Sequence, residues 1–135
     1  MKKTPLRLAT QLVLTASLLS CATSKSAHGL KVNQLISKQD KLLSQRVTVE
    51  GYLRFSSNSR NLWHSQKSSE TEPYEDCVSV GWSESNLKRL MSFDGKMVRI
   101  TGTLAHRPFG EDEVNLWYCN EWYIAAERVT LTIAH

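Results

Sequence analysis

The chain has 135 residues, of which 41% are hydrophobic, and its formal net charge is +4. This length favours a single domain. Three of the 17 basic residues, Lys2, Lys3 and Arg7, lie at the very start of the chain, and the others nearly balance the 13 acidic residues. This balance disfavours nucleic acid as a partner, because binding nucleic acid depends on a basic surface.

The first 20 residues have the layout of an export signal. Basic residues precede an apolar run at positions 8–19, and small residues follow at Ser20 and Cys21. The run is shorter than the ~20 residues that a membrane-spanning helix needs, and no later segment is comparable. We therefore expect residues 1–20 to be a signal peptide and the mature chain to contain no membrane-spanning segment.

The end of this signal, Leu18-Leu19-Ser20-Cys21, resembles the lipobox of bacterial lipoproteins. The resemblance implies cleavage before Cys21 and acylation of that cysteine, so that buried acyl chains anchor the protein to a membrane. Ala22, where an aspartate would signal retention, indicates the outer membrane, with the protein facing the periplasm. Residues 21–29 are small and polar and are expected to form a tether. An ordinary secretory signal with an incidental cysteine is the alternative.

Two cysteines remain after Cys21, namely Cys77 and Cys119. In an oxidising envelope compartment, two cysteines are expected to form one disulfide. Two free buried thiols, or a redox pair, are the alternatives. No Cys-x-x-Cys spacing supports redox chemistry.

Beyond the tether, apolar residues at helical spacing predict a short helix from about Val32, broken between positions 37 and 40, whose apolar face plugs one end of the fold. Residues 46–56 alternate between apolar and polar side chains, which predicts a long half-buried strand with a bend at Gly51. A turn at 57–61, a second strand that begins at Leu62, and a polar, mobile loop at 66–76 follow.

Residues 77–82 alternate again and predict a third strand. Ser83 followed by Glu84 is typical of a helix start, with a serine cap and an acid in the first turn. A fourth strand is predicted at 96–106, where Gly102 stands in the same apolar pattern as Gly51. After a turn-rich loop at 108–113, residues 114–118 and 122–133 supply the last strand or strands.

Three strands, a helix and two further strands are the element order of the OB fold. The predicted fold is therefore mainly β, a five-stranded OB-like Greek-key barrel over residues 30–135. It has a helix between strands three and four and a short N-terminal helix. The segments 46–53, 77–80 and 95–104 resemble small bacterial envelope proteins with an OB-like, tRNA-anticodon-binding-like domain. That resemblance implies a fold and a compartment but no catalytic residue.

The candidate binding face consists of Tyr52, Arg54, Trp63 and His64. OB folds bind bases or sugars on a face that is built on strands two and three. Aromatic rings on this face can stack on a ligand. The alternative is that these rings pack in the core or at its rim, as most tryptophans do.

Catalytic chemistry has little support in the sequence. His64, His106, Cys77 and Cys119 share no local ligand spacing, so we expect no metal and no cofactor. The acidic clusters at 70–76 and 111–113 fall in predicted loops, and no Gly-x-Ser-x-Gly motif is present.

We therefore expect a non-catalytic binding or adaptor module, held at the membrane by its lipid anchor, that meets an envelope protein, a glycan or a small ligand. Two alternatives stay open. One is a structural or stress-related envelope accessory without a defined ligand, and the other is a small envelope hydrolase.

Overall fold

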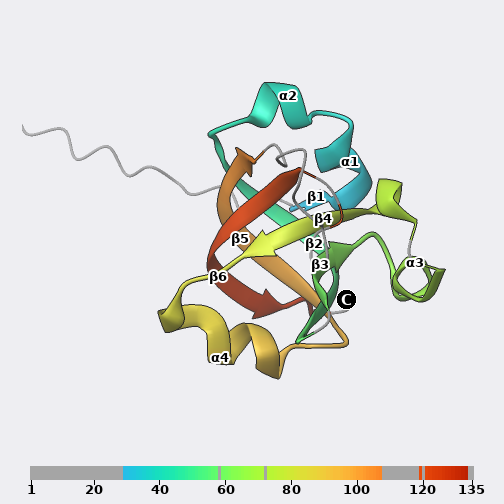
Figure 1. Cartoon of the computed structure of the whole chain (residues 1–135), viewed down its shortest axis with the longest axis vertical. Helices are drawn as coiled ribbons and strands as arrows, with labels where there is room; N and C mark the ends of the chain where they lie inside the picture. Colours follow the sequence, from blue (N-terminus) through green and yellow to red (C-terminus); the bar gives the residue numbers. More distant parts are fainter. Residues whose placement is uncertain (1–28, 58, 72, 108–118, 120, 134–135) are drawn as a thin grey trace, which may run out of the picture.

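The computed structural model describes residues 29–57, 59–71, 73–107, 119 and 121–133 (Figure 1). The signal peptide, Cys21, the tether up to residue 28, and the predicted segments 108–113 and 114–118 lie outside the described residues. The strands are β1 Leu30–Lys31, β2 Arg46–Ser56, β3 Ser59–Trp63, β4 Cys77–Gly81, β5 Lys96–His106 and β6 Trp122–Leu131. The helices are α1 Val32–Ile36, α2 Gln39–Leu42, α3 Gln66–Thr71 and α4 Glu84–Ser92, with a 3₁₀ turn, η1, at Tyr74–Asp76.

The described residues are mainly β and form a six-stranded sheet in the order β1-β2-β3-β4-β6-β5. An additional pairing of β2 with β5 curls this sheet into a partial ring, visible in Figure 1. The sheet has one strand more than the five predicted. The extra strand, β1, pairs in parallel with β2 through Leu30 and Val49, and two residues are too short to show an alternating pattern.

The two glycine-centred segments, β2 and β5, pair directly and antiparallel, with Gly51 opposite Val98 and Gly102 opposite Val47. Each glycine stands where another chain segment approaches closely. A Cβ on Gly51 would lie 2.6 Å from the carbonyl oxygen of Trp63, and one on Gly102 would collide with the carbonyl of Ala125. Only a residue without a side chain fits at these two positions.

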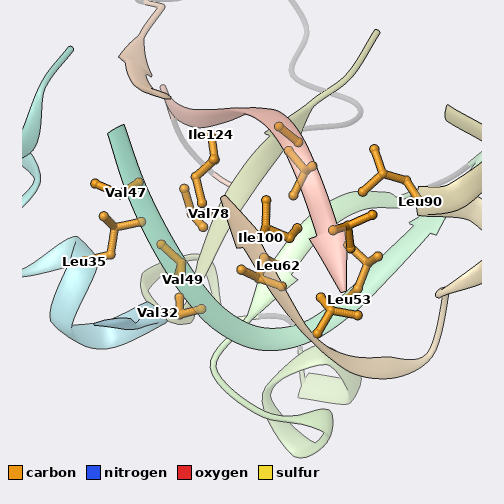
Figure 2. Close-up of a cluster of buried hydrophobic side chains, with 14 of the residues drawn as sticks. Val32, Leu35, Val47, Val49, Leu53, Leu62, Val78, Leu90, Ile100 and Ile124 are labelled. Carbon is orange, nitrogen blue, oxygen red and sulfur yellow. The ribbon is translucent and has the colours of Figure 1, made fainter. Parts of the chain in front are cut away.

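The core lies inside the curled sheet and is formed mainly by the apolar side chains that point inward from the long strands (Figure 2). The predicted break of the N-terminal helix is confirmed, because α1 and α2 are separate. Val32 and Leu35 of α1 are fully buried in this core. The predicted inner row of β2 is confirmed too, and its four members are Val47, Val49, Leu53 and Phe55.

Two local predictions are wrong. The predicted turn at 57–61 is shorter, because β3 already begins at Ser59. The predicted loop at 66–76 contains α3 and η1. Helix α3 shows no apolar periodicity because it buries Ser68 and Ser69 instead of apolar residues. The hydroxyl of Ser65 accepts a hydrogen bond from the Ser68 backbone N–H at 3.1 Å and so caps the helix start.

Helix α4 and β5 agree with their predictions. The Asn86 side chain accepts a hydrogen bond from the Ser83 backbone N–H at 2.9 Å, which fixes the start of α4. The same side chain donates to the carbonyl of Ala126 in β6. This link holds the N-terminal end of α4 against β6, and Leu90 of α4 is buried in the core.

Candidate functional site

The residues of the predicted binding face come from the outer side of β2 and β3. Tyr52 lies opposite Trp63, and Arg54 lies opposite Asn61. Residues directly opposite each other in a sheet share one face, so Tyr52, Arg54 and Trp63 are brought together. His64 follows the end of β3, and its side chain is exposed while its backbone N–H donates to the carbonyl of Asp76 at 2.8 Å.

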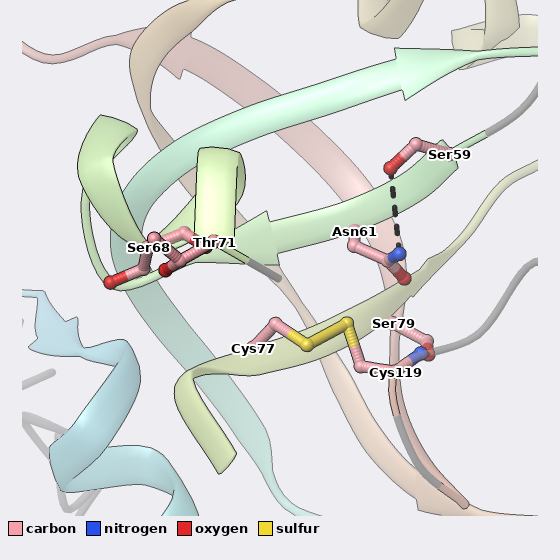
Figure 3. The surroundings of a disulfide bond; sticks show 7 residues. All are labelled: Ser59, Asn61, Ser68, Thr71, Cys77, Ser79 and Cys119. Carbon is pink, nitrogen blue, oxygen red and sulfur yellow. Dashed lines mark hydrogen bonds between the residues drawn. A yellow bond between two sulfur atoms is a disulfide. The ribbon is translucent and has the colours of Figure 1, made fainter. Parts of the chain in front are cut away.

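The disulfide covers part of this outer face. Cys77 and Cys119 are bonded, as predicted, with their Cα atoms 5.8 Å apart. The Cys119 backbone N–H donates to the hydroxyl of Ser79 at 3.0 Å, so Cys119 lies over β4 (Figure 3). Trp63 packs against both cysteines and is only 4% exposed. Its ring therefore has no open face on which a ligand could stack.

Beside this covered region, an open groove begins at the Gly81 end of β4 and continues over β6 and β5. The face continues from Gly81 of β4 to Ala125 of β6, and from Ala125 to Thr103 of β5. The groove has a volume of about 560 Å³. Its lining comprises Gly81, Trp82, Ser83, Ser85, Thr103, Tyr123, Ala125, Ala126 and Glu127.

Small residues make the groove floor and aromatic rings border it. The ring of Tyr123 lies directly over Gly81, where an added Cβ would be 3.0 Å from the ring. The guanidinium of Arg60 lies 3.9 Å from the ring centre of Trp82, and the Phe55 ring is packed nearly perpendicular to Trp82 at 5.9 Å. These contacts fix the orientation of Trp82, because stacking on a cation and on an aromatic edge are both favourable.

The charged group of the groove is already partnered. Glu127 accepts a hydrogen bond from Arg46 at 2.9 Å, and the two side chains are 47% and 64% exposed, respectively. Only one oxygen of the carboxylate makes this contact. The groove thus presents aromatic rings, hydroxyls and a compensated carboxylate.

Among the described residues, one serine hydroxyl directly contacts a carboxylate. Ser68 donates directly to the carboxylate of Asp76 at 3.1 Å, with no imidazole between them, and Glu70 accepts from Gln66. Within the same described ranges, no three His, Cys, Asp or Glu side chains gather as a metal site would require. Hydrolysis needs an activated nucleophile beside a base, or two opposed carboxylates.

Glu50 has an environment that strand alternation did not predict. It stands on the outer side of β2, yet its side chain is only 10% exposed. Lys31 of β1 donates to one carboxylate oxygen at 2.6 Å, and Arg99 of β5 donates to the other. The hydrogen bond from Lys31, followed by that from Arg99, holds the pKa of Glu50 below its usual value despite the opposing effect of burial. This carboxylate fastens β1, the first described strand, to the sheet.

Replacing Glu50 with glutamine should lower the free energy of unfolding by about 1–2 kcal/mol at pH 7, because the ion pairs are lost while the exposed cations stay hydrated. A lowered pKa in the folded state stabilises the fold above the ordinary glutamate value of about 4.3, and this stabilisation is lost as the pH falls through the folded pKa. Urea denaturation at pH 7 and near pH 3 should therefore show that the difference in free energy of unfolding between the wild type and the variant becomes smaller in acid.

Glu127→Gln is the control, because it changes an exposed ion pair, and it should lower the free energy of unfolding by less than about 0.5 kcal/mol. An equal effect of both variants would contradict the role assigned to Glu50.

No protein-family model matches the chain, and no curated protein is significantly similar to it. Among the described residues, no helix is long and apolar enough to cross a membrane. The chemistry of the groove and the covered face beside it are therefore the observations from which function is inferred.

Proposed function

We propose that the chain is a lipid-anchored protein of the bacterial envelope, attached through Cys21, whose barrel is a non-catalytic binding module. The export signal and the lipobox-like end support the anchor. The Cys77–Cys119 disulfide supports an oxidising compartment such as the periplasm, because structural disulfides persist there and are rare in the cytosol.

The finer architecture of this proposal is an OB-like Greek-key barrel. After β1, α1 and α2, the chain runs through β2, β3 and β4, then α4, then β5 and β6. The antiparallel pairs β2–β3, β3–β4 and β5–β6, the parallel pair β4–β6 and the additional pair β2–β5 all support this topology. Such barrels bind ligands on the outer face of their second and third strands, which are β3 and β4 here.

The observation that carries the binding function is the groove at the Gly81 end of this face. Concave sites with oriented rings and a few polar groups are the usual form of ligand sites. The groove lies beside the part of the face that Cys119 covers, and its floor is formed by Gly81 and Ala125. The binding surface that we propose is therefore displaced from Trp63 toward Tyr123 and Trp82.

The anchor is tested by Cys21→Ser and membrane fractionation. We expect the wild type in the outer-membrane fraction and the variant in the soluble periplasmic fraction, since anchoring depends on acyl chains at this cysteine. Ser24→Ala serves as the control, because it changes a residue near the acylation position without touching Cys21 or the disulfide. Membrane attachment of the Cys21→Ser variant would refute the lipid anchor.

The binding function is tested by photo-crosslinking in intact cells. A photoreactive side chain at the exposed position Ala125, on the groove floor, should give light-dependent adducts. The same group at Leu131, which is 47% exposed further along β6 and outside the groove, should give none. Adducts that are absent at Ala125, or equal at both positions, would argue against a binding module and in favour of a structural or stress-related accessory.

A further inference from the structure

We propose that the groove binds a neutral saccharide, an inference that rests on the proposed binding function and names its ligand class. A sugar ring has an apolar face of C–H groups that packs on aromatic rings, and a perimeter of hydroxyls that need donors and acceptors. The groove offers both features within one hollow of about 560 Å³, a size within the range of small-molecule sites.

The aromatic contacts come from Tyr123 and Trp82. Tyr123 is half-buried, and its ring lies so close to Gly81 that a Cβ added there would be 3.0 Å from a ring carbon, which restricts the movement of the ring toward the sheet. Arg60 occupies one face of Trp82, so a ligand in the groove would meet the opposite face or the ring edge. Rings fixed in advance bind with a smaller loss of side-chain entropy.

The polar contacts come from residues that both donate and accept. The hydroxyls of Ser83 and Ser85 lie 2.8 Å apart at the start of α4, and Thr103 adds a third hydroxyl to the lining. A hydroxyl is at once a donor and an acceptor, as sugar hydroxyls are. The Glu127 oxygen that does not contact Arg46 is a further acceptor at the same rim.

The composition of the lining disfavours other ligand classes. It contains no lysine or arginine and includes a carboxylate, whereas nucleic acids and phosphates need cationic contacts. An extended peptide would add to a free strand edge, but β4, β5 and β6 each pair with a neighbour on both sides. A helical peptide would need a continuous apolar groove, and three hydroxyls interrupt this one.

The test is a titration of the full-length mature lipoprotein in micelles of a detergent without a sugar headgroup. The probes are maltotetraose and the tetramer of N-acetylglucosamine, added up to about 10 mM, and the readout is the ¹⁵N–¹H signal of the Trp82 indole. We expect saturable shifts with at least one probe. Tyr123→Ala should weaken this binding at least about tenfold, and Tyr123→Phe, which keeps the ring, should weaken it less.

Ala125→Arg is the decisive variant, because position 125 is exposed and the new side chain fills the groove without disturbing the core. It should abolish saccharide binding, whereas Leu131→Arg, the same change outside the groove, should leave it intact. Saccharide binding that survives Ala125→Arg would overturn the proposal, as would the lack of any saturable shift. If crosslinks form at position 125 while no saccharide binds, the binding module stands and the ligand is of another class; if neither is seen, both proposals fail.

Discussion

Removal of the disulfide is expected to lower the free energy of unfolding by about 4 kcal/mol in the double variant Cys77→Ala/Cys119→Ala. The two cysteines are 42 positions apart in the sequence. Opening a loop of this size restores conformational entropy to the unfolded chain, by about 4 kcal/mol in the chain-entropy model. Small domains have about 5–15 kcal/mol in total, so this single bond supplies a large share of the stability.

Denaturant unfolding of the full-length protein in micelles, followed by near-ultraviolet circular dichroism, measures this loss. Ser79→Ala is the matched control, since it removes the hydrogen bond from Cys119 but keeps the covalent bond. That variant should lose only about 1 kcal/mol. If the double-cysteine variant loses less free energy of unfolding than the Ser79→Ala variant, the disulfide contributes little to the stability of the fold.

Gly102→Ala is expected to destabilise the protein by about 3 kcal/mol or more. The added Cβ would collide with the carbonyl of Ala125, and the Cα of Ala126 would be 3.0 Å away. These are backbone atoms at a bulge in the β5–β6 register, so they can yield only if the strand pairing itself is distorted. The damage should extend to the groove, because Ala125 forms part of its floor.

Gly95→Ala is the matched control for this collision. Gly95 has a positive φ of 72°, but an added Cβ would meet only the Tyr52 hydroxyl, at 3.5 Å. Its expected cost is about 1 kcal/mol of backbone strain. The midpoint temperature of thermal unfolding should therefore be well below that of Gly95→Ala for the Gly102→Ala variant. The reverse order would contradict the packing described for β5 and β6.

Most of the sheet could be predicted because its strands carry a strong local pattern. The strands β2 and β5 have the boundaries that alternation indicated, 46–56 and 96–106. The capped start of α4 after Ser83 was equally visible in the sequence. In each case the buried residues are apolar and recur with the period of the element.

Elements held together by polar contacts could not be predicted in this way. Helix α3 buries serines, and its cap is a serine hydroxyl. Strand β1 is held partly by Lys31, whose partner Glu50 belongs to the polar row of β2. The contact of Lys31 with Glu50 joins positions that are distant in sequence, and neither this contact nor the serine cap of α3 produces an apolar periodicity.

The candidate site was only partly visible for the same reason. Tyr52, Arg54 and Trp63 do share a face, but Cys119 lies over part of it and buries Trp63. The groove depends on the parallel pairing of β4 with β6, which brings Gly81 beside Ala125. The run Gly81-Trp82-Ser83-Glu84-Ser85, which combines a small residue, an aromatic ring and two hydroxyls at the end of β4, was the signal that could have indicated it.

Cys119 covers the outer side of the sheet at Trp63 and β4, whereas the groove that begins at Gly81 and continues over β6 and β5 is open. A soluble gadolinium chelate, which broadens the NMR signals of exposed protons, tests this division directly in the oxidised protein. We predict strong broadening of the Ala125 methyl signal and a persistent signal for the buried Trp63 indole. Equal broadening of both signals, or a protected Ala125 beside an exposed Trp63, would contradict the account.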